Sequence, residues 1–576
     1  MTLFLYKVPF LLELFYNGTF ILLYSMRSIK KLPSQWDPAI VDQVIRFGAW
    51  GIPFVIFLGI FSVFHQTKSL NEFFRKHIFS LIVLIPLVMT WGDLEFAFWL
   101  SSAHLLSSVL SLYDSDAPKP AKAFELGGES LFKKLKLTPA QLVMLSFGMV
   151  IALGTFLLML PVSVVEGKKL GIIDALFLST SATCVTGLAT KSVGSDLTFF
   201  GQSVILVLIQ IGGLSIMTLY SSMTILLGRS MGMKDRIILQ DMLDVSSLEE
   251  LFTIIMDIIK FTFFIELWGG VVLTIAFAFD DFEFGTALYY GFFHSISAFC
   301  NAGFALFDTS LESYATNPLV NITVMILITM GGLGFLCLNE LKLLFTRKLH
   351  YTRLSFHTKI VLVTSFVLTV SGTVFFFFGE FLNALDGYGL FDKVMISMFQ
   401  SVTLRTAGFN TIPMTSMHSY SLYLMVLFMF IGGSPGSTAG GIKTTSLAIL
   451  VQAIKTTLKG RDKVIIFDRK ISSQIVVKTT ALTFISIIIV SFFVLILMKF
   501  EPNQSFLSIV YEVVSASGTV GLTLGVTSEL STMGKLAITV AMFIGRIGPL
   551  TMVLAIGQRH HQEGKFDYPD GRIMIG

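Results

Sequence analysis

Hydrophobic residues occur along this chain in long runs that polar segments separate. Many runs reach the roughly 20 residues that an α-helix needs to cross about 30 Å of hydrocarbon. Between pairs of long runs lie shorter, half-apolar stretches, for example near residues 174–184 and 391–404. This pattern predicts an all-α polytopic membrane protein rather than a set of water-soluble domains.

The order of long run, short stretch and long run occurs four times, which predicts four repeats of membrane helix, pore helix and membrane helix. The repeats extend over residues 138–228, 251–346, 356–455 and 474–557. A glycine closely follows each short stretch, at Gly187, Gly303, Gly408 and Gly521. Farther along, each repeat has a pair of residues that begins with glycine: Gly212-Gly213, Gly331-Gly332, Gly432-Gly433 and Gly545-Arg546. A register kept in four places indicates internal repeats around a pseudo-fourfold axis.

The chain outside the repeats has a different pattern. Residues 1–137 contain apolar runs without a comparable glycine, which predicts two or three extra N-terminal membrane helices of open topology. Residues 558–576 are polar and are expected to form a cytoplasmic C-terminal tail. The three cysteines have neither the spacing of a metal site nor the number of a disulfide framework.

Composition and charge support a membrane location and orient the repeats. Hydrophobic residues make up 54% of the chain and charged residues 14%, and the mean hydropathy is +0.78; soluble proteins carry about 25% charged residues. Lysine and arginine concentrate between the repeats, at 342–359 and 455–470. By the positive-inside rule each repeat begins and ends in the cytoplasm, so its short stretch must enter from the outside and return.

The four glycine turns predict a cation pathway. Irregular backbone at membrane depth leaves carbonyls unpaired, at several kcal/mol each in lipid, and is tolerated where it lines a water-filled path. Rings of carbonyls replace the hydration shell of potassium in selective channels, and glycine permits the positive φ that such turns require. The expected filter residues are Val185, Thr186, Gly187, Asn301, Ala302, Gly303, Thr406, Ala407, Gly408, Thr519, Val520 and Gly521.

Residues 432–445, the third-repeat loop, interrupt an apolar run with five glycines and Pro435, which predicts an intramembrane gate below the filter. Arg546 stands where the other repeats have glycine. Because arginine near the bilayer centre costs at least about 2.5–3.5 kcal/mol, we expect it to face this loop, to oppose cations or to hold backbone carbonyls. The expected gate residues are Gly436, Ser437, Thr438, Ala439, Gly440, Gly441, Lys443 and Arg546.

The strings at 183–188, 405–409 and 432–445 resemble the pore-forming membrane subunit of the Trk/Ktr/HKT superfamily of potassium transporters, and the N-terminal extension resembles the bacterial Trk type. The resemblance covers about 138–576. It implies potassium uptake across a bacterial cytoplasmic (inner) membrane, a homodimer, and a cytosolic nucleotide-binding regulatory subunit. In plant relatives a serine at the first filter glycine goes with sodium preference, so Gly187 favours potassium as the bound ion.

Other functions remain open or are disfavoured. A sodium-permeable or proton-coupled cation symporter of the same fold is the main alternative, although a proton relay needs an intramembrane acid and the sequence places none convincingly near the turns. Gly432 through Gly436 match Gly-x-Ser-x-Gly, but between helical runs this is no nucleophile elbow, and no enzyme is expected. Arg405 is expected to brace the third turn, His294 to be a packing residue, and nucleic acid not to be a partner.

Overall fold

The computed structural model describes residues 15–27, 38–64, 94–113, 139–214, 248–280, 282–345, 353–548 and 552. The chain divides into two compact units, Met1–Ser130 and Leu131–Gly576, close to the boundary expected at 137. In the first unit α2 (Pro38–Phe64) packs against α4 (Leu94–Tyr113). The predicted tail at 558–576 and the ends of two long runs, 215–228 and 553–557, lie outside the described residues.

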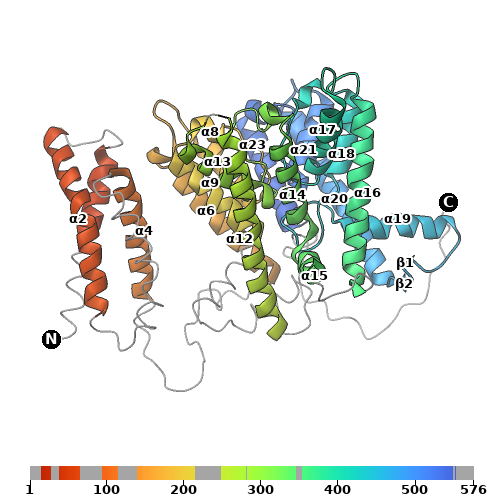
Figure 1. Ribbon diagram of the computed structural model, residues 1–576, viewed down its shortest axis with the longest axis horizontal. Helices are drawn as coiled ribbons and strands as arrows, with labels where there is room; N and C mark the ends of the chain where they lie inside the picture. Colours follow the sequence, from red (N-terminus) through yellow and green to blue (C-terminus); the bar gives the residue numbers. More distant parts are fainter. Residues whose placement is uncertain are drawn as a thin grey trace. The chain divides into compact units, whose positions relative to one another are not determined.

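The second unit is built almost wholly of helices (Figure 1). Its only described strands are the two-residue pair β1 (Ile465–Ile466) and β2 (Arg469–Lys470). Short helical turns connect the longer helices: η1 (Pro161–Ser163), α8 (Val193–Asp196), η2 (Glu312–Tyr314), η4 (Met414–Ser416) and α22 (Val526–Glu529). The predicted all-α fold class is confirmed.

Each repeat contains a first long helix, a short helix and a second long helix. The first has α6 (Pro139–Leu158), α7 (Ile172–Thr183) and α9 (Phe199–Leu214), and the second has α12 (Leu248–Ala278), α13 (Phe284–Phe299) and α14 (Pro318–Leu333), which α15 (Phe335–Phe345) continues. The third has α16 (Phe356–Gly379), α17 (Leu390–Thr403), α18 (Ser419–Met429) and α19 (Thr444–Leu458). The fourth has α20 (Ser473–Phe500), α21 (Phe506–Gly518) and α23 (Thr532–Ile547).

The four repeats close into a ring. The second long helix of one repeat packs on the short helix of the next: α9 on α13, α14 on α17, α18 on α21, and α23 back on α7. The short helices are largely buried, whereas long helices carry exposed apolar side chains such as Phe366 and Phe378 on α16 and Ile488 on α20. Apolar surface of this extent suits a lipid environment rather than water.

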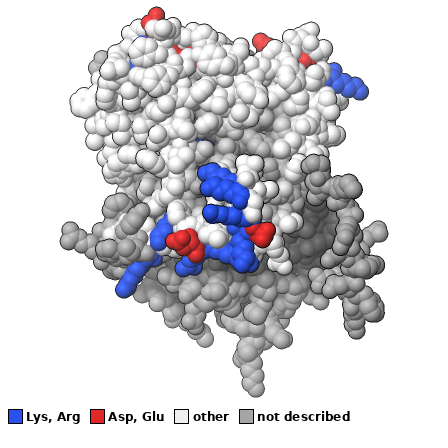
Figure 2. All heavy atoms as spheres, turned by 90° about the vertical axis from the view of Figure 1, so that its right-hand side faces the viewer, with Lys and Arg blue, Asp and Glu red and all other residues white. Residues whose placement is uncertain are grey.

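Only some of the described helices are long enough to cross a membrane. Three are long and apolar enough to span a bilayer: Asp257–Ala278, Phe356–Gly379 and Ser473–Phe500. A fourth candidate is the pair formed by α14 and α15, bent by 111°. On the face that bears α16, α19, β1 and β2, Figure 2 shows basic side chains gathered toward one end, below a broad uncharged band. The exposed basic residues in the last turn of α19 and between α19 and α20 are Lys455, Lys459, Arg461, Lys463, Arg469 and Lys470.

The second long helix of the second repeat is interrupted. It breaks at Gly334, which has φ of 88° and separates α14 from α15. The third-repeat loop causes the break, because the N–H of Phe335 donates to the carbonyl of Gly436 at 3.0 Å. A Cβ at Gly334 would lie 2.6 Å from the carbonyl oxygen of Pro435. The bend therefore makes room for a segment from another repeat.

Candidate functional site

The four glycine turns share one backbone conformation. Their glycines all have positive φ: 97° at Gly187, 70° at Gly303, 79° at Gly408 and 94° at Gly521. Two residues earlier, each turn places a non-glycine residue in the left-handed region: Val185, Asn301, Thr406 and Thr519, with φ of 53° to 64°. Such residues adopt this region only rarely. The same strained turn is therefore built four times.

These turns face one another around a closed ring. A Cβ built on any of the four glycines would collide with the carbonyl oxygen that precedes the glycine of the next repeat. The separations would be 2.6 Å from Gly187 to Ala302, 2.8 Å from Gly303 to Ala407, 2.6 Å from Gly408 to Val520 and 2.1 Å from Gly521 to Thr186. The last contact returns to the first repeat. Twelve predicted filter residues thus lie in four turns that meet at one place.

The N–H groups of the turns are held by the short helices behind them. The N–H groups of Thr186, Ala302 and Val520 donate to the carbonyls of Ser181, Ser297 and Ser515 at 2.7 to 2.8 Å. In the third repeat the N–H of Ala407 donates to Thr403 at 2.9 Å. Since the donors are directed to the helices, the carbonyls of the turns remain available for a cation.

Hydroxyl groups brace the turns as well, and sequence reasoning missed them. The hydroxyl oxygens of Ser181 and Ser515 accept the N–H groups of Gly187 and Gly521, each at 3.1 Å. Ser297 donates to the carbonyl of Phe304 at 2.8 Å, and Thr403 donates to that of Phe409 at 2.6 Å. The signal was present in the sequence, because a serine lies six residues before the glycine in three of the four repeats.

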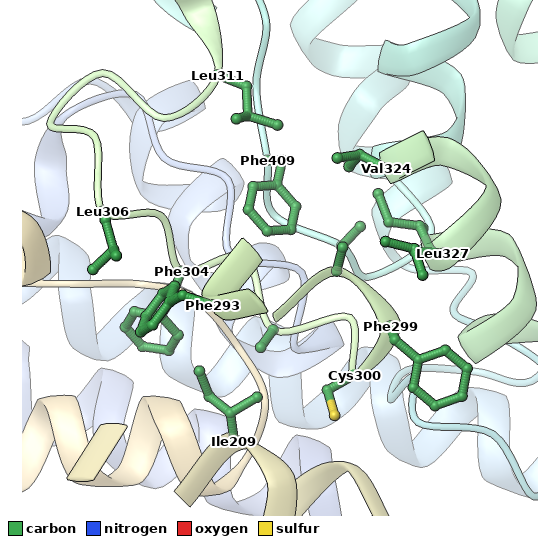
Figure 3. Packing of buried hydrophobic residues seen from close by; sticks show 14 of the residues in the cluster. Ile209, Phe293, Phe299, Cys300, Phe304, Leu306, Leu311, Val324, Leu327 and Phe409 are labelled. Atoms are coloured by element: carbon green, nitrogen blue, oxygen red, sulfur yellow. The ribbon is translucent and has the colours of Figure 1, made fainter. Parts of the chain in front are cut away.

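The second turn also lies in a tightly packed apolar region. Figure 3 shows Phe293 of α13 beside Phe304, while Phe299 and Cys300 at the end of the same helix and Phe409 of the third turn lie among the surrounding side chains. All five side chains are buried. Close packing of this kind resists displacement, so it fixes the position of the turn relative to its neighbour.

The glycine pairs in the second long helices pack beneath the turns. A Cβ at Gly212, Gly331 or Gly545 would lie 1.9 to 2.1 Å from a carbonyl oxygen four residues before the turn glycine, at Thr183, Phe299 and Ser517. In the third repeat the partner differs, since Gly432 packs against the carbonyl of Gly440. The third-repeat loop thus replaces a contact that the other repeats make with the short helix.

This loop lies directly against the turns. The N–H groups of Ser434 and Thr438 donate to the carbonyls of Gly332 at 3.0 Å and Gly331 at 3.3 Å. A Cβ at Gly440 would lie 2.2 Å from the hydroxyl oxygen of Thr519 in the fourth turn. Thr438 and Ala439 are buried. Gly436, Ser437 and Gly441 complete the loop, and Gly436 is exposed.

Two basic side chains hold carbonyls of the loop. The guanidinium of Arg546 donates to the carbonyls of Thr438 and Gly212, so it joins the loop to the second long helix of the first repeat. The ammonium of Lys443 donates to the carbonyl of Ala439 at 2.7 Å. Within the described part of the chain, neither cation has a carboxylate at ion-pair distance. Arg546 therefore contacts the loop in the structure, and its effect on cations stays a prediction.

The sequence interpretation overlooked two buried acids. Glu266 on α12 is 3% exposed, accepts from the amide of Gln210 at 3.3 Å and contacts the thiol of Cys300 at 3.9 Å, next to the second turn. Glu512 on α21 is 0% exposed. The expectation that no convincing intramembrane acid lies near the turns is therefore wrong. In the sequence each acid occurs singly within a largely apolar run, and its contacts appear only when the chain folds.

Two further predicted residues have different outcomes. His294 is a buried packing residue, whose Nδ1 lies 2.7 Å from the carbonyl of Tyr290 and whose ring stacks on Phe307. Arg405 is also buried, but among the described residues its Nε has no hydrogen-bond partner. The hydroxyl of Thr403, rather than an observed contact of Arg405, braces the third turn.

Comparison with known proteins agrees with this geometry. Residues 131–568 match the TrkH family, which is described as cation transport protein. Ktr system potassium uptake protein B of Bacillus subtilis is 38% identical over 450 residues, covering 78% of this chain and 99% of that protein. Potassium/sodium uptake protein NtpJ of Enterococcus hirae is 34% identical over 446 residues, covering 77% and 98%.

A solved structure shows the same fold. The crystal structure of the potassium transporter TrkH from Vibrio parahaemolyticus aligns with a TM-score of 0.58 at 17% identity, covering 88% of this chain and 97% of that one. The matched relatives are transporters, which confirms that the chain is not an enzyme and supports a multi-pass membrane protein. Because the family match spans most of its length, this chain belongs to the TrkH family of cation transport proteins.

Proposed function

We propose that this chain takes up potassium across a bacterial cytoplasmic membrane through the ring of four glycine turns. The observation that carries the proposal is the closed set of contacts from Gly187 through Gly303, Gly408 and Gly521 back to Thr186. With their N–H groups bonded to the short helices, the carbonyls of such a ring can replace the hydration shell of a monovalent cation. Potassium is then the transported ion rather than a resident cofactor.

The choice of potassium rests on two observations. Relatives at 38% and 35% identity, from Bacillus subtilis and Vibrio alginolyticus, are both named Ktr system potassium uptake protein B. In this chain all four turns keep glycine, and the position of Gly187 leaves no space for a side chain beside Ala302. An inside-negative potential supplies about 2.3 kcal/mol per charge per 100 mV, which is sufficient to drive uptake without ATP hydrolysis by this chain.

The third-repeat loop is proposed as the gate. It lies against Thr519 of the fourth turn, and Arg546 and Lys443 hold its carbonyls. Two cations without a paired carboxylate in the described residues would repel a permeating cation. Opening then requires that the loop leave Arg546, so one movement removes the obstruction and displaces Lys443 with the loop.

Partners are proposed from the relatives and from the charge distribution. Two relatives from Bacillus subtilis are named as proteins of a Ktr system, which favours a membrane subunit that works with other components. We propose a homodimer with a cytosolic nucleotide-binding regulatory subunit. The exposed basic segment between α19 and α20 offers an electrostatic surface for that subunit or for anionic lipid.

Sodium permeation is a second candidate function, favoured by one observation. NtpJ, which shares 34% identity, is named a potassium/sodium uptake protein. The buried Glu266 beside Cys300 likewise provides an acid that proton coupling would need. These alternatives change the ion or the coupling but keep the same pathway.

Growth of a potassium-uptake-deficient bacterial strain tests the proposal. Expression of the parent chain with its partner subunit should restore growth at low potassium, and absence of rescue by a well-expressed chain would contradict potassium uptake. Gly187→Ser should reduce rescue and increase inhibition by sodium, because serine must adopt φ of 97° against the carbonyl of Ala302. Gly148→Ser on α6 is the matched control, since no atom outside its own helix lies within 4 Å of a Cβ there.

A further inference from the structure

Glu512 is a buried carboxylate that neither the ring nor the gate explains. It lies in the middle of α21 with 0% of its surface exposed. One carboxylate oxygen accepts from the hydroxyl of Thr523 at 2.8 Å, and the other accepts from the hydroxyl of Thr527. Within the described residues no lysine or arginine lies at ion-pair distance from it. The acid therefore depends on two hydroxyl groups alone.

These hydroxyls connect Glu512 to the outer side of the fourth turn. Thr523 lies two residues beyond Gly521, and its hydroxyl oxygen also accepts the N–H of Gly525 at 3.1 Å. Before the turn, Ser515 of the same helix accepts the N–H groups of Val520 and Gly521. The short helix α21 thus holds the fourth turn on both sides of its glycine. Ser515 binds the N–H of Gly521 itself, and Glu512 binds Thr523, which follows the glycine.

Comparison among the repeats shows that this position is specialised. The residues nine positions before the turn glycines are Leu178, His294, Phe399 and Glu512. His294 makes an equivalent contact, because its Nε2 accepts the N–H of Leu306 at 3.3 Å, three residues beyond Gly303. Leu178 and Phe399 are apolar. A polar residue at this position therefore braces the segment after the turn in two repeats, and only the fourth repeat has an acid there.

A buried carboxylate without a basic partner is costly to a fold. A cation in the adjacent turn is a counter-charge that offsets this cost, and the attraction between the two is strong because little water separates them. Charge on Glu512 thereby favours occupation of the ring. The acid is placed behind the turn rather than in the pathway, so it attracts the cation without competing with the carbonyls as a ligand.

We propose that Glu512 is a positioning and specificity-determining residue, which fixes Thr523 behind the fourth turn and supplies the negative charge that balances a cation in the ring. This inference rests on the proposed potassium uptake. It assigns unequal roles to the four turns. The fourth turn has the fixed charge of Glu512 behind it, whereas the second turn is braced by a neutral imidazole contact at His294.

Uptake of 86Rb+ and potassium by cells that express the full chain with its partner subunit tests the proposal. Glu512→Gln keeps the shape and acceptor oxygen but removes the charge. The half-saturating potassium concentration should rise about fivefold or more, a change of at least about 1 kcal/mol, while the maximal rate changes less than roughly twofold. The preference for potassium over sodium should fall in parallel. His294→Gln, at the equivalent position, should change the half-saturating concentration much less.

The proposal is overturned if Glu512→Gln reaches the membrane at the parent level and keeps both its half-saturating concentration and its ion preference. Should this variant fail to reach the membrane, Thr523→Val decides the question. Loss of that hydroxyl should raise the half-saturating concentration in the same direction, and an unchanged value would overturn the inference. Failure of the parent chain itself to take up potassium would contradict the proposed function instead, so the two failures are distinguishable.

Discussion

Arg546 of the fourth repeat donates a hydrogen bond to the backbone carbonyl of Thr438 in the third-repeat loop. The same guanidinium donates to Gly212 in the first repeat, so a single side chain joins three of the four repeats beneath the ring. Such a contact both offsets part of the cost of an arginine at membrane depth and holds the loop in place. It explains why an arginine is found where the other repeats have glycine.

Replacement of Arg546 by alanine should increase cation flux. The loop would lose one of its anchors and the pathway would lose a positive charge, and both changes lower the barrier. We expect a rise of roughly tenfold or more in the potassium leak of reconstituted vesicles, corresponding to about 1.4 kcal/mol. Lys499→Gln is the matched control, because Lys499 is an exposed cation at the end of α20. Equal flux through the parent and Arg546→Ala at equal protein density would contradict the gate.

Replacement of Ser515 by alanine should weaken the fourth turn. The buried N–H of Gly521 would lose its acceptor, and an unsatisfied buried donor costs about 1–3 kcal/mol. We expect reduced discrimination between potassium and sodium in competition uptake, together with a lower midpoint of thermal inactivation. Ser203→Ala serves as the control, since within the described segments the Ser203 hydroxyl bonds only the carbonyl of Phe199 in its own helix. Parent-like selectivity in Ser515→Ala would show that the hydroxyl does not brace the turn.

The sequence was sufficient to locate the turns and the loop, because glycine marks both of them. Gly187, Gly303, Gly408 and Gly521 are needed where the backbone has positive φ and no space for a side chain. Glycines and Pro435 likewise mark the loop. Each requirement concerns the glycine or proline itself, so it can be recognised from the sequence alone.

Features that depend on contacts between separate segments of the chain could not be predicted in this way. Gly334 ends α14 because the loop of another repeat occupies the space beyond it. Glu512 gains its partners, Thr523 and Thr527, only after the chain has turned back on its short helix. Both depend on distances across the fold, and no local pattern around either residue encodes them.

The contact at Gly334 provides a separate test of the gate. Gly334→Ala must place a methyl group 2.6 Å from the carbonyl of Pro435 with φ of 88°, so the loop should be displaced. We expect a higher basal flux, or a lower protein yield if the bend cannot form. Gly285→Ala on α13 is the control, because no atom outside its own helix lies within 4 Å of a Cβ there. Normal yield with unchanged flux would show that this contact does not hold the loop.

A pH-dependent effect is expected outside the membrane segments, at Glu312 in η2. Burial raises the pKa of this carboxyl above its ordinary value, although the amide of Asn410, at 2.7 Å, opposes the shift. A raised pKa in the folded state means that folding favours the protonated form, so its stabilising contribution is present at low pH and is lost as pH rises through the folded pKa.

Glu312→Gln imitates the protonated carboxyl at every pH. Relative to the parent, the variant should have nearly equal thermal stability below the ordinary glutamate pKa of about 4.3 and higher stability above the raised pKa. Thermal unfolding of both proteins across pH measures this difference. A constant difference, or one that grows toward acid, would contradict the assignment to Glu312.

The central claim is that four turns form one cation site. Diffraction from crystals of the protein soaked in Tl+ or Rb+ tests it most directly, because the anomalous signal locates the ion. We predict a peak on the ring axis, among the carbonyl oxygens of Thr186, Ala302, Ala407 and Val520, that potassium displaces. Absence of a peak there at saturating Tl+, with the turns well ordered, would contradict the account.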